Sequence, residues 1–176
     1  MKKTLFLISF FFLTSQIFAL GAGIQISAKP GISFPLSENT SNPDFIMGEN
    51  ITGTFRTERF PAVYAVGFDF EETKNEFLFG LNLTFDYWIF EKQLINIMNC
   101  YGGTGVTADF RLGENQMLNL DAGLRAFLGL NWHFFDGFME YYLQIAAAPV
   151  FATNLKTGSS AINLFFPVES GLRLHF

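Results

Sequence analysis

Apolar and polar residues alternate strictly along three long segments of the chain. Between residues 118 and 130 every even-numbered residue is Leu or Ala, while the odd-numbered residues are polar, charged or Gly, apart from Phe127. The same alternation runs over 77–89 and over 162–176, where only Ser170 interrupts the apolar face. A period of two is that of a β-strand with one apolar and one polar face. The pattern therefore predicts long strands.

The length of these segments narrows the class of protein. Strands of soluble proteins usually run about 5–6 residues, whereas a tilted strand needs roughly 9–11 residues to cross a bilayer. The alternating segments exceed both lengths, and their apolar faces carry no charged residue. Alternation alone also fits a soluble β-barrel with the apolar face inward. The long, charge-free faces favour a barrel with lipid outside.

Weaker alternation elsewhere completes a scheme of eight strands, the even number expected of a bacterial single-chain barrel. The predicted fold class is all-β, an eight-stranded antiparallel up-and-down transmembrane β-barrel. Gly102-Gly103 and Asp136-Gly137 are its predicted tight turns. The expected strands are 21–34, 61–71, 76–90, 93–101, 104–112, 117–132, 138–152 and 161–176.

The strand count fixes the side on which each link lies, if both chain ends face the periplasm. Links 35–60, 91–92, 113–116 and 153–160 would then lie outside the cell, and 72–75, 102–103 and 133–137 in the periplasm. Link 35–60 is the longest, and we expect it either to contact a host molecule or other surface ligand, or to be a solvated loop without a partner.

Outward aromatic residues gather near the predicted strand ends, as in the two interfacial girdles of outer-membrane barrels. Eight of them are assigned to the periplasmic end: Phe68, Phe70, Phe77, Phe79, Trp132, Phe134, Tyr141 and Phe176. Phe85, Tyr87 and Phe166 are assigned nearer the outer end.

The polar faces would place many charges inside the barrel. The candidate lumen charge network comprises Asp109, Arg111, Asp121, Arg125, Glu140, Glu169 and Arg173. Acids and bases in a narrow lumen can form ion pairs, and the expected pairs are Arg125 with Asp121 or Glu140, and Arg173 with Glu169. Eight strands leave room only for side chains, and four predicted lumen residues are bulky: Trp88, Phe127, Tyr142 and Phe165. A wide pore is therefore not expected.

Composition and the N-terminal residues set the compartment. Hydrophobic residues make up 49% of the chain and charged ones 15%, below the usual quarter or so of soluble proteins. Lys2 and Lys3, the apolar run 5–13 and Ala19 match a secretory signal peptide. We therefore expect residues 1–19 to be a cleaved signal peptide, with Ala22 as a second cleavage point, and 20–176 to be the barrel domain.

Charge and reactive residues exclude several functions. The chain has 11 basic and 16 acidic residues, and an acidic protein is a poor partner for nucleic acid. Cys100 is the only cysteine, so no internal disulfide is possible. His133 and His175 both fall at the predicted periplasmic end, which leaves no histidine to act as general base at the outer rim. We expect no enzyme activity, no catalytic or metal-binding residues and no cofactor.

The chain ends on Leu172-x-Leu174-x-Phe176, which resembles the C-terminal assembly signal of bacterial outer-membrane barrels. Together with the eight-strand pattern, the mature chain resembles the small barrels of the OmpA-domain, OmpX and OmpW kind. The resemblance implies insertion by the outer-membrane barrel assembly machinery and outer-membrane lipid as surroundings. It points to a structural or surface-interaction role, with two alternatives: a narrow channel or carrier for small or apolar solutes, or a soluble periplasmic ligand-binding β-barrel.

Overall fold

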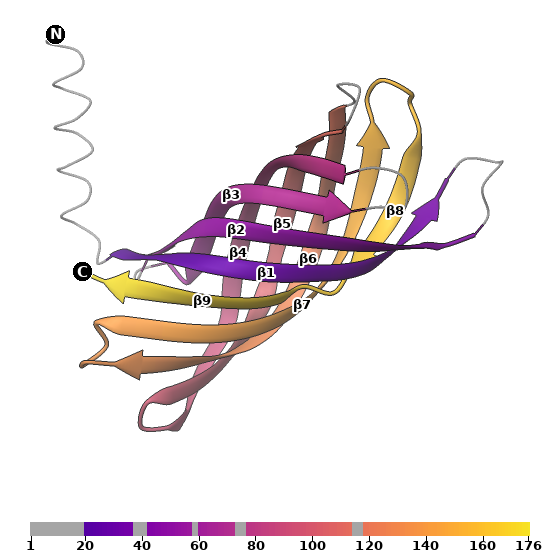
Figure 1. The fold of residues 1–176 in the computed structure, drawn as a ribbon. Helices are drawn as coiled ribbons and strands as arrows, with labels where there is room; N and C mark the ends of the chain where they lie inside the picture. Colours follow the sequence, from indigo (N-terminus) through magenta and orange to yellow (C-terminus); the bar gives the residue numbers. More distant parts are fainter. Residues whose placement is uncertain (1–19, 37–41, 58–59, 73–76, 114–117) are drawn as a thin grey trace, which may run out of the picture.

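The computed structural model describes residues 20–36, 42–57, 60–72, 77–113 and 118–176. The expected signal peptide 1–19 lies outside them. The described part is built from antiparallel strands, seen as one curved sheet in Figure 1. They are β1 (Leu20–Pro35), β2 (Asp44–Thr57), β3 (Ala62–Glu72), β4 (Phe77–Ile95), β5 (Met98–Leu112), β6 (Leu118–Phe134), β7 (Met139–Asn154), β8 (Ser160–Phe165) and β9 (Val168–His175).

The sheet closes into a ring of eight, because β8 and β9 are two halves of one interrupted strand. Both halves lie between β7 and β1, in one continuous register on either side. The interruption falls at Phe166-Pro167, since proline has no amide proton to donate to the ladder. Two hydrogen bonds hold the gap: Phe166 N–H donates to the Pro30 carbonyl and Ala146 N–H to the Pro167 carbonyl, each at 2.8 Å.

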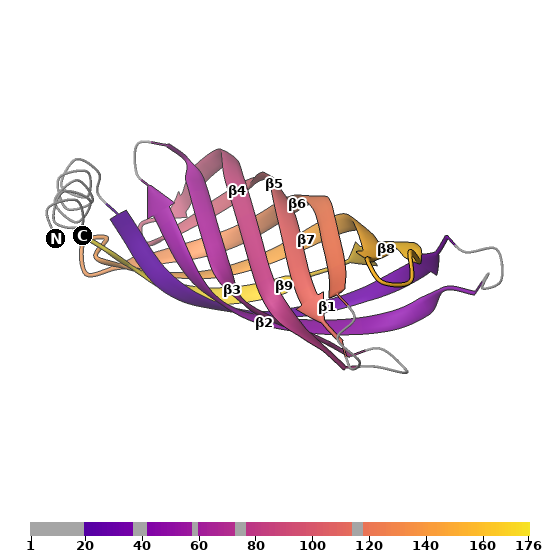
Figure 2. The ribbon, with the colours of Figure 1, turned by 90° about the horizontal axis from the view of Figure 1, so that it is seen from above.

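The strands are strongly tilted against the barrel axis. A path of cross-strand partners leaves β7 at Ile145, runs once around the ring, and returns at Leu155, one residue past the end of β7 and ten residues further on. With about 3.3 Å per residue and about 4.8 Å between strands, this stagger corresponds to a tilt of about 40°. Figure 2 shows the strands running obliquely across the barrel.

Two predictions of strand boundaries were wrong. One strand was missed and one was predicted in excess, so the predicted number of eight strands is still correct. Residues 44–57 of the predicted link 35–60 form β2, which alternates poorly because its outward positions include Glu49 and Gly53. The predicted strands 93–101 and 104–112 form parts of β4 and β5, and Gly102-Gly103 lies within β5. A Cβ atom on Gly102 would stand 2.7 Å from the side chains of Phe90 and Leu128. That glycine therefore serves close packing and not a turn.

These corrections change which end of the barrel several segments occupy. Predicted outer link 91–92 lies inside β4, and predicted periplasmic link 72–75 begins at Glu72, at the same end of the barrel as Pro35 and Asp44. We label this end the outer end; the strand termini that lie there are Pro35, Asp44, Glu72, Phe77, Leu112, Leu118, Asn154 and Ser160. The other end, labelled periplasmic, carries the strand termini Leu20, Thr57, Ala62, Ile95, Met98, Phe134, Met139 and His175. The turn at Asp136-Gly137 is confirmed, and Phe135, Asp136 and Gly137 all have positive φ there.

The corrected strand boundaries also change the end of the barrel to which several outward aromatic residues belong. Phe68, Phe70, Phe77 and Phe79 lie near the outer end, where neighbouring rings pack at centroid distances of 5.3–6.3 Å. Phe85 and Tyr87 lie towards the periplasmic end and Phe166 near mid-height, opposite Pro30. Trp132 and Tyr141, whose ring centroids are 5.6 Å apart, lie at the end that was predicted for them.

The predicted facing of the strands is confirmed. Leu124 and Leu128 point outward with 66% and 55% of their surface exposed, whereas Asp121 and Arg125 on the same strand are buried. The outer wall is thus apolar and the interior polar. Among the described residues there is no helix of the length and hydropathy needed to cross a bilayer.

Candidate functional site: the packed lumen

A cluster of ion pairs fills the outer half of the lumen and centres on Arg111 of β5. Its guanidinium contacts the carboxylates of Glu71 and Asp121 directly, and lies 3.5 Å from Asp69 and 3.9 Å from Asp109. The Lys29 ammonium contacts Asp69 and lies 3.3 Å from Asp109. All these groups are buried. We call these six residues the outer cluster, in which four carboxylates share two cations.

A second group lies in the middle of the lumen, around Arg125 of β6. Two guanidinium nitrogens of Arg125 bind both carboxylate oxygens of Glu169 at 3.0 and 2.7 Å. A third nitrogen lies 3.0 Å from Asp86, and Gln144 donates to Glu169 at 2.7 Å. The predicted pairing of Arg125 with Asp121 or Glu140 was wrong. Asp121 is four residues along the same strand, about 13 Å away, so the side chain reaches across the lumen instead.

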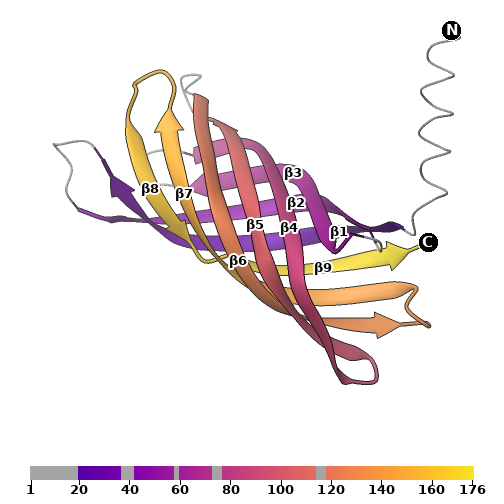
Figure 3. The ribbon, with the colours of Figure 1, turned by 180° about the vertical axis from the view of Figure 1, so that it is seen from behind.

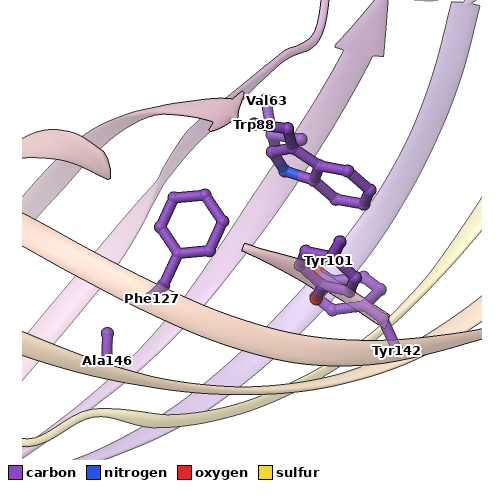
Figure 4. Close-up of a cluster of buried hydrophobic side chains, with 6 residues drawn as sticks. All are labelled: Val63, Trp88, Tyr101, Phe127, Tyr142 and Ala146. Carbon is purple, nitrogen blue, oxygen red and sulfur yellow. The ribbon is translucent and has the colours of Figure 1, made fainter. Parts of the chain in front are cut away.

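An aromatic layer separates these groups from the periplasmic end (Figure 4). Trp88 and Tyr101 stack with ring centroids 3.8 Å apart, and Phe127 packs against Tyr101 at 6.3 Å. Tyr142 lies in the same cluster of buried side chains and donates a 2.8 Å hydrogen bond to Gln25. The prediction that Trp88, Phe127, Tyr142 and Phe165 are lumen residues is confirmed, since each is almost fully buried.

A third group, the periplasmic cluster, centres on the fully buried carboxylate of Glu140. The guanidinium groups of Arg173 and Arg56 each lie 3.2 Å from it, His175 lies at 3.0 Å, and Asn131 donates to it at 2.9 Å. The predicted pairing of Arg173 with Glu169 was wrong, because Arg173 turns towards Glu140. Both arginines also cover aromatic rings: Arg56 lies 4.0 Å above Trp88, and Arg173 lies 3.8 Å above Tyr142.

Glu91 extends this cluster beyond the ring. It lies in the part of β4 that continues past Tyr87, the last β4 residue paired with β3. This part forms a hairpin with β5, and Figure 3 shows the hairpin projecting from the end of the barrel. Arg56 contacts Glu91 at 2.7 Å, and Asn131 and Asn99 donate to it at 3.0 and 3.1 Å. Partial burial raises the pKa of Glu91, but the neighbouring His133 ring, 3.8 Å away, the charge of Arg56 and hydrogen bonds from the asparagines outweigh it and lower the pKa to about 2.

The interior leaves little free space. A lumen cavity of about 10 Å³ lies between the outer and middle groups, beside Asn50, Asn82 and Thr107. That is room for about one water molecule. The buried oxygen atoms of Ser27, Asn50 and Thr52 have no hydrogen-bond partner within the described part of the protein. Within the same described residues, no three His, Cys, Asp or Glu side chains converge as metal ligands.

All seven residues of the candidate network lie in the lumen, but they form separate groups. Asp109, Arg111 and Asp121 belong to the outer cluster, Arg125 and Glu169 to the middle group, and Glu140 and Arg173 to the periplasmic cluster. The sequence prediction missed two cations, Lys29 and Arg56. Lys29 follows Gln25 and Ser27 on one face of β1, and Arg56 follows Thr52 and Thr54 on one face of β2. Those short alternations are the signal that would have found them.

A closed ring of eight tilted strands, with an apolar outer wall and a lumen filled by charged and aromatic side chains, defines the class of eight-stranded outer-membrane β-barrels. The known structure of Neisserial surface protein A, NspA, has this fold: it matches with a TM-score of 0.58 over 88% of this chain and 97% of NspA, at 10% sequence identity. The predicted resemblance is therefore confirmed at the level of the fold.

Other comparisons are weaker. The attachment invasion locus protein Ail of Yersinia pestis matches 89% of this chain and 98% of its own, at 11% identity, with a TM-score of 0.28 that is too low to establish a common fold. No protein-family model and no curated protein sequence matches the chain.

Proposed function

We propose that this protein is a structural and surface-interaction barrel of a bacterial outer membrane. The observation that supports this most is the contrast between its two faces: the outer wall suits hydrocarbon, while the lumen is packed with paired charges and rings. A barrel of this kind stabilises the membrane and holds loops at the cell surface. NspA, whose fold it shares, is named a surface protein.

The outer links are the proposed contact surface for a partner. The expectation of one long loop at 35–60 is replaced by four short links at one end. Link 155–159 is well ordered, because the Asn154 side chain accepts hydrogen bonds from the backbone N–H groups of Lys156 and Thr157, both at 3.0 Å. Such a compact loop can present a fixed surface to a host molecule or a neighbouring protein.

Export and assembly belong to the same proposal. Residues 1–19 would direct the chain through the inner membrane and be removed, and mass spectrometry of the mature protein would then find Leu20, or Gly23 after cleavage at Ala22, as its first residue. Leu172 and Phe176 are exposed on the outward face of the last strand. With Leu174, they are the proposed contacts of the assembly machinery during insertion.

The experiment that tests the proposal is fractionation of native cells combined with heat-modifiable migration on gels. We expect the protein in the outer membrane, extracted only by detergent, with a folded form that migrates differently from the boiled form. Recovery in the soluble periplasm with no heat shift would support the soluble ligand-binding alternative and contradict the proposal.

The channel alternative is tested in planar bilayers. The stacked Trp88 and Tyr101, with the arginines over neighbouring rings, oppose passage along the axis. We expect no stable opening from the unaltered barrel. Arg125→Leu provides the matched variant: a stable wild-type conductance that disappears in this variant would favour a polar solute path through the lumen.

A further inference from the structure

One carboxylate lies on the outward face of the barrel among apolar side chains. Glu49 of β2 is exposed. Its outward neighbours along the strand are Met47 and Ile51, and its partners on the adjacent strands are Ala28 of β1 and Phe70 of β3. Within the described residues, no side-chain hydrogen bond or ion pair engages the Glu49 carboxylate. This is unlike the lumen, where the carboxylates contact cations.

The depth of Glu49 places it within the apolar band. It lies five residues after Asp44, where β2 begins. At a tilt of about 40°, each residue advances about 2.5 Å along the axis, so Glu49 lies about 12 Å below the outer end of β2. Phe45 is exposed above it and Phe55 below it. The carboxylate is therefore flanked by apolar surface towards both ends of the barrel.

Glu49 also lines a groove in the outer wall. The groove has a volume of about 440 Å³, and Ile26, Ala28, Phe70 and Ser170 line it together with Glu49. The Ser170 hydroxyl lies on the same outward face and donates a 3.1 Å hydrogen bond to the Tyr141 hydroxyl. The groove thus contains apolar surface, the carboxylate of Glu49 and the small residue Ala28, which would let a neighbouring molecule approach closely.

An ionisable side chain at this depth is unfavourable in lipid alone and normally marks a function. Since the barrel would be more stable with an apolar residue at position 49, the carboxylate requires an explanation outside the isolated chain. A cation brought to it by a partner would neutralise the charge in a low-dielectric setting, where an ion pair is strong.

We propose that this groove is a lateral docking site for a second, different membrane protein that places a Lys or Arg side chain against Glu49. This inference rests on the proposed membrane location. A lipid ammonium group belongs at the headgroup level, well above Glu49. Within the described part of the chain, a second copy offers no matching cation, because Lys29, Arg56, Arg111, Arg125 and Arg173 are directed into the lumen, and Lys92 and Lys156 lie near the two ends of the barrel.

The test uses a photoreactive amino acid at Ala28, in the full chain expressed in its native outer membrane. Irradiation is carried out with Glu49 intact, with Glu49→Gln and with Glu49→Lys. The matched control carries the photoreactive residue at Ala126, in a groove of about 650 Å³ on the β4–β7 wall beside Leu124 and Ala147. The charged residue that borders this groove, Arg125, is buried and directs its side chain into the lumen.

We expect a discrete adduct with another protein from position 28, and none from position 126. Glu49→Gln should reduce the adduct about tenfold, which corresponds to about 1.4 kcal/mol, and Glu49→Lys should abolish it. Mass spectrometry then identifies the partner peptide, and replacing its Lys or Arg by Glu should restore the adduct of the Glu49→Lys variant. This charge-swap rescue is the supporting result.

An adduct unaffected by Glu49→Lys, an adduct only between two copies of this chain, or lipid adducts alone would overturn the inference. Heat-modifiable migration of each variant verifies that it is folded. A chain found in the soluble fraction would contradict the proposed function itself, whereas a folded chain in the outer membrane that forms no protein adduct would contradict the docking site alone.

Discussion

The outer and periplasmic clusters of the lumen are built in opposite ways. In the outer cluster, Arg111 and Lys29 lie among four carboxylates. In the periplasmic cluster, the carboxylate of Glu140 receives two arginines and His175, and Glu91 at the edge of the cluster contacts one of these arginines. The two clusters also differ in how they can respond when a substitution removes one charged partner. A carboxylate that loses its cation can take up a proton, whereas an arginine that loses its anion remains charged.

Buried ion pairs of similar geometry therefore need not be equally replaceable. An excess of carboxylates can neutralise itself at mildly acidic pH, so the outer cluster tolerates charge imbalance. The periplasmic cluster has no such route, because its cations are mainly arginines, and it depends on Glu140 with a smaller contribution from Glu91. Substitutions at Glu140 and Arg111 distinguish the two clusters, and the free energy of unfolding should fall most for a change at Glu140.

Glu140→Ala should be the most damaging change. It removes the carboxylate beside the fully buried Arg173, while Arg56 keeps its contact with Glu91, and breaking a buried pair in this way costs about 3–5 kcal/mol. Urea unfolding of the barrel in lipid vesicles would measure the loss. Acidification should not recover it, because an arginine that has lost its anion keeps its charge at every accessible pH. Equal stability of Glu140→Ala and the unaltered barrel would show that Glu140 does not hold the cluster together.

Arg111→Met should destabilise the barrel by about 3 kcal/mol at pH 8, since four carboxylates would then share Lys29 alone. Unlike the first variant, it should regain much of this stability between pH 8 and pH 5 as carboxylates take up protons. The same unfolding measurement at both pH values checks this. If Arg111→Met and Glu140→Ala respond to pH in the same direction, the proposed contrast between the clusters is wrong.

Leu124→Arg places a cation on the apolar outer wall, facing away from the carboxylates of the lumen. A basic residue facing the middle of a bilayer costs about 2–4 kcal/mol. Leu155→Arg is the control, because Leu155 is exposed in a link at the outer end, and it should change the free energy of unfolding by less than about 0.5 kcal/mol. Comparable losses from both variants would argue against lipid around Leu124.

Glu91→Gln should have the smallest effect and a distinct pH dependence. Because the pKa of Glu91 is lowered from 4.5 to about 2, its carboxylate stabilises the fold fully above its ordinary pKa. That contribution is lost as the pH falls towards 2. Thermal unfolding between pH 5 and pH 3 should therefore show a steeper loss for the unaltered protein than for Glu91→Gln. Parallel curves would contradict the assignment.

The fold could be predicted from the sequence because a strand that crosses lipid must carry apolar residues at its outward positions, which are every second residue. In β6, apolar residues occupy successive even positions, so both the strand and its facing could be predicted. In β2 the rule is obscured, since Glu49 and Gly53 occupy outward positions. Gly102-Gly103 was misleading because a glycine pair suits a hairpin turn and a crowded strand equally well.

The groups within the lumen could not be predicted from sequence alone. Which charges meet depends on the stagger between strands, which brings Arg125 of β6 to Glu169 of β9 and Arg173 of β9 to Glu140 of β7. Strand order along the chain contains no direct record of that stagger. The sequence therefore predicted which side chains lie inside but not their partners.

The proposed function requires that the leucine face of β6 lies against hydrocarbon and that the interior is packed and closed. Nitroxide labels at Leu124, Leu128 and Ala146, in a Cys100→Ser background and in lipid vesicles, test it directly through relaxation by oxygen and by a water-soluble nickel chelate. We predict that Leu124 and Leu128 labels respond strongly to oxygen and hardly to nickel, and that the Ala146 label responds weakly to both. Strong nickel relaxation at Leu124 and Leu128 would contradict the account.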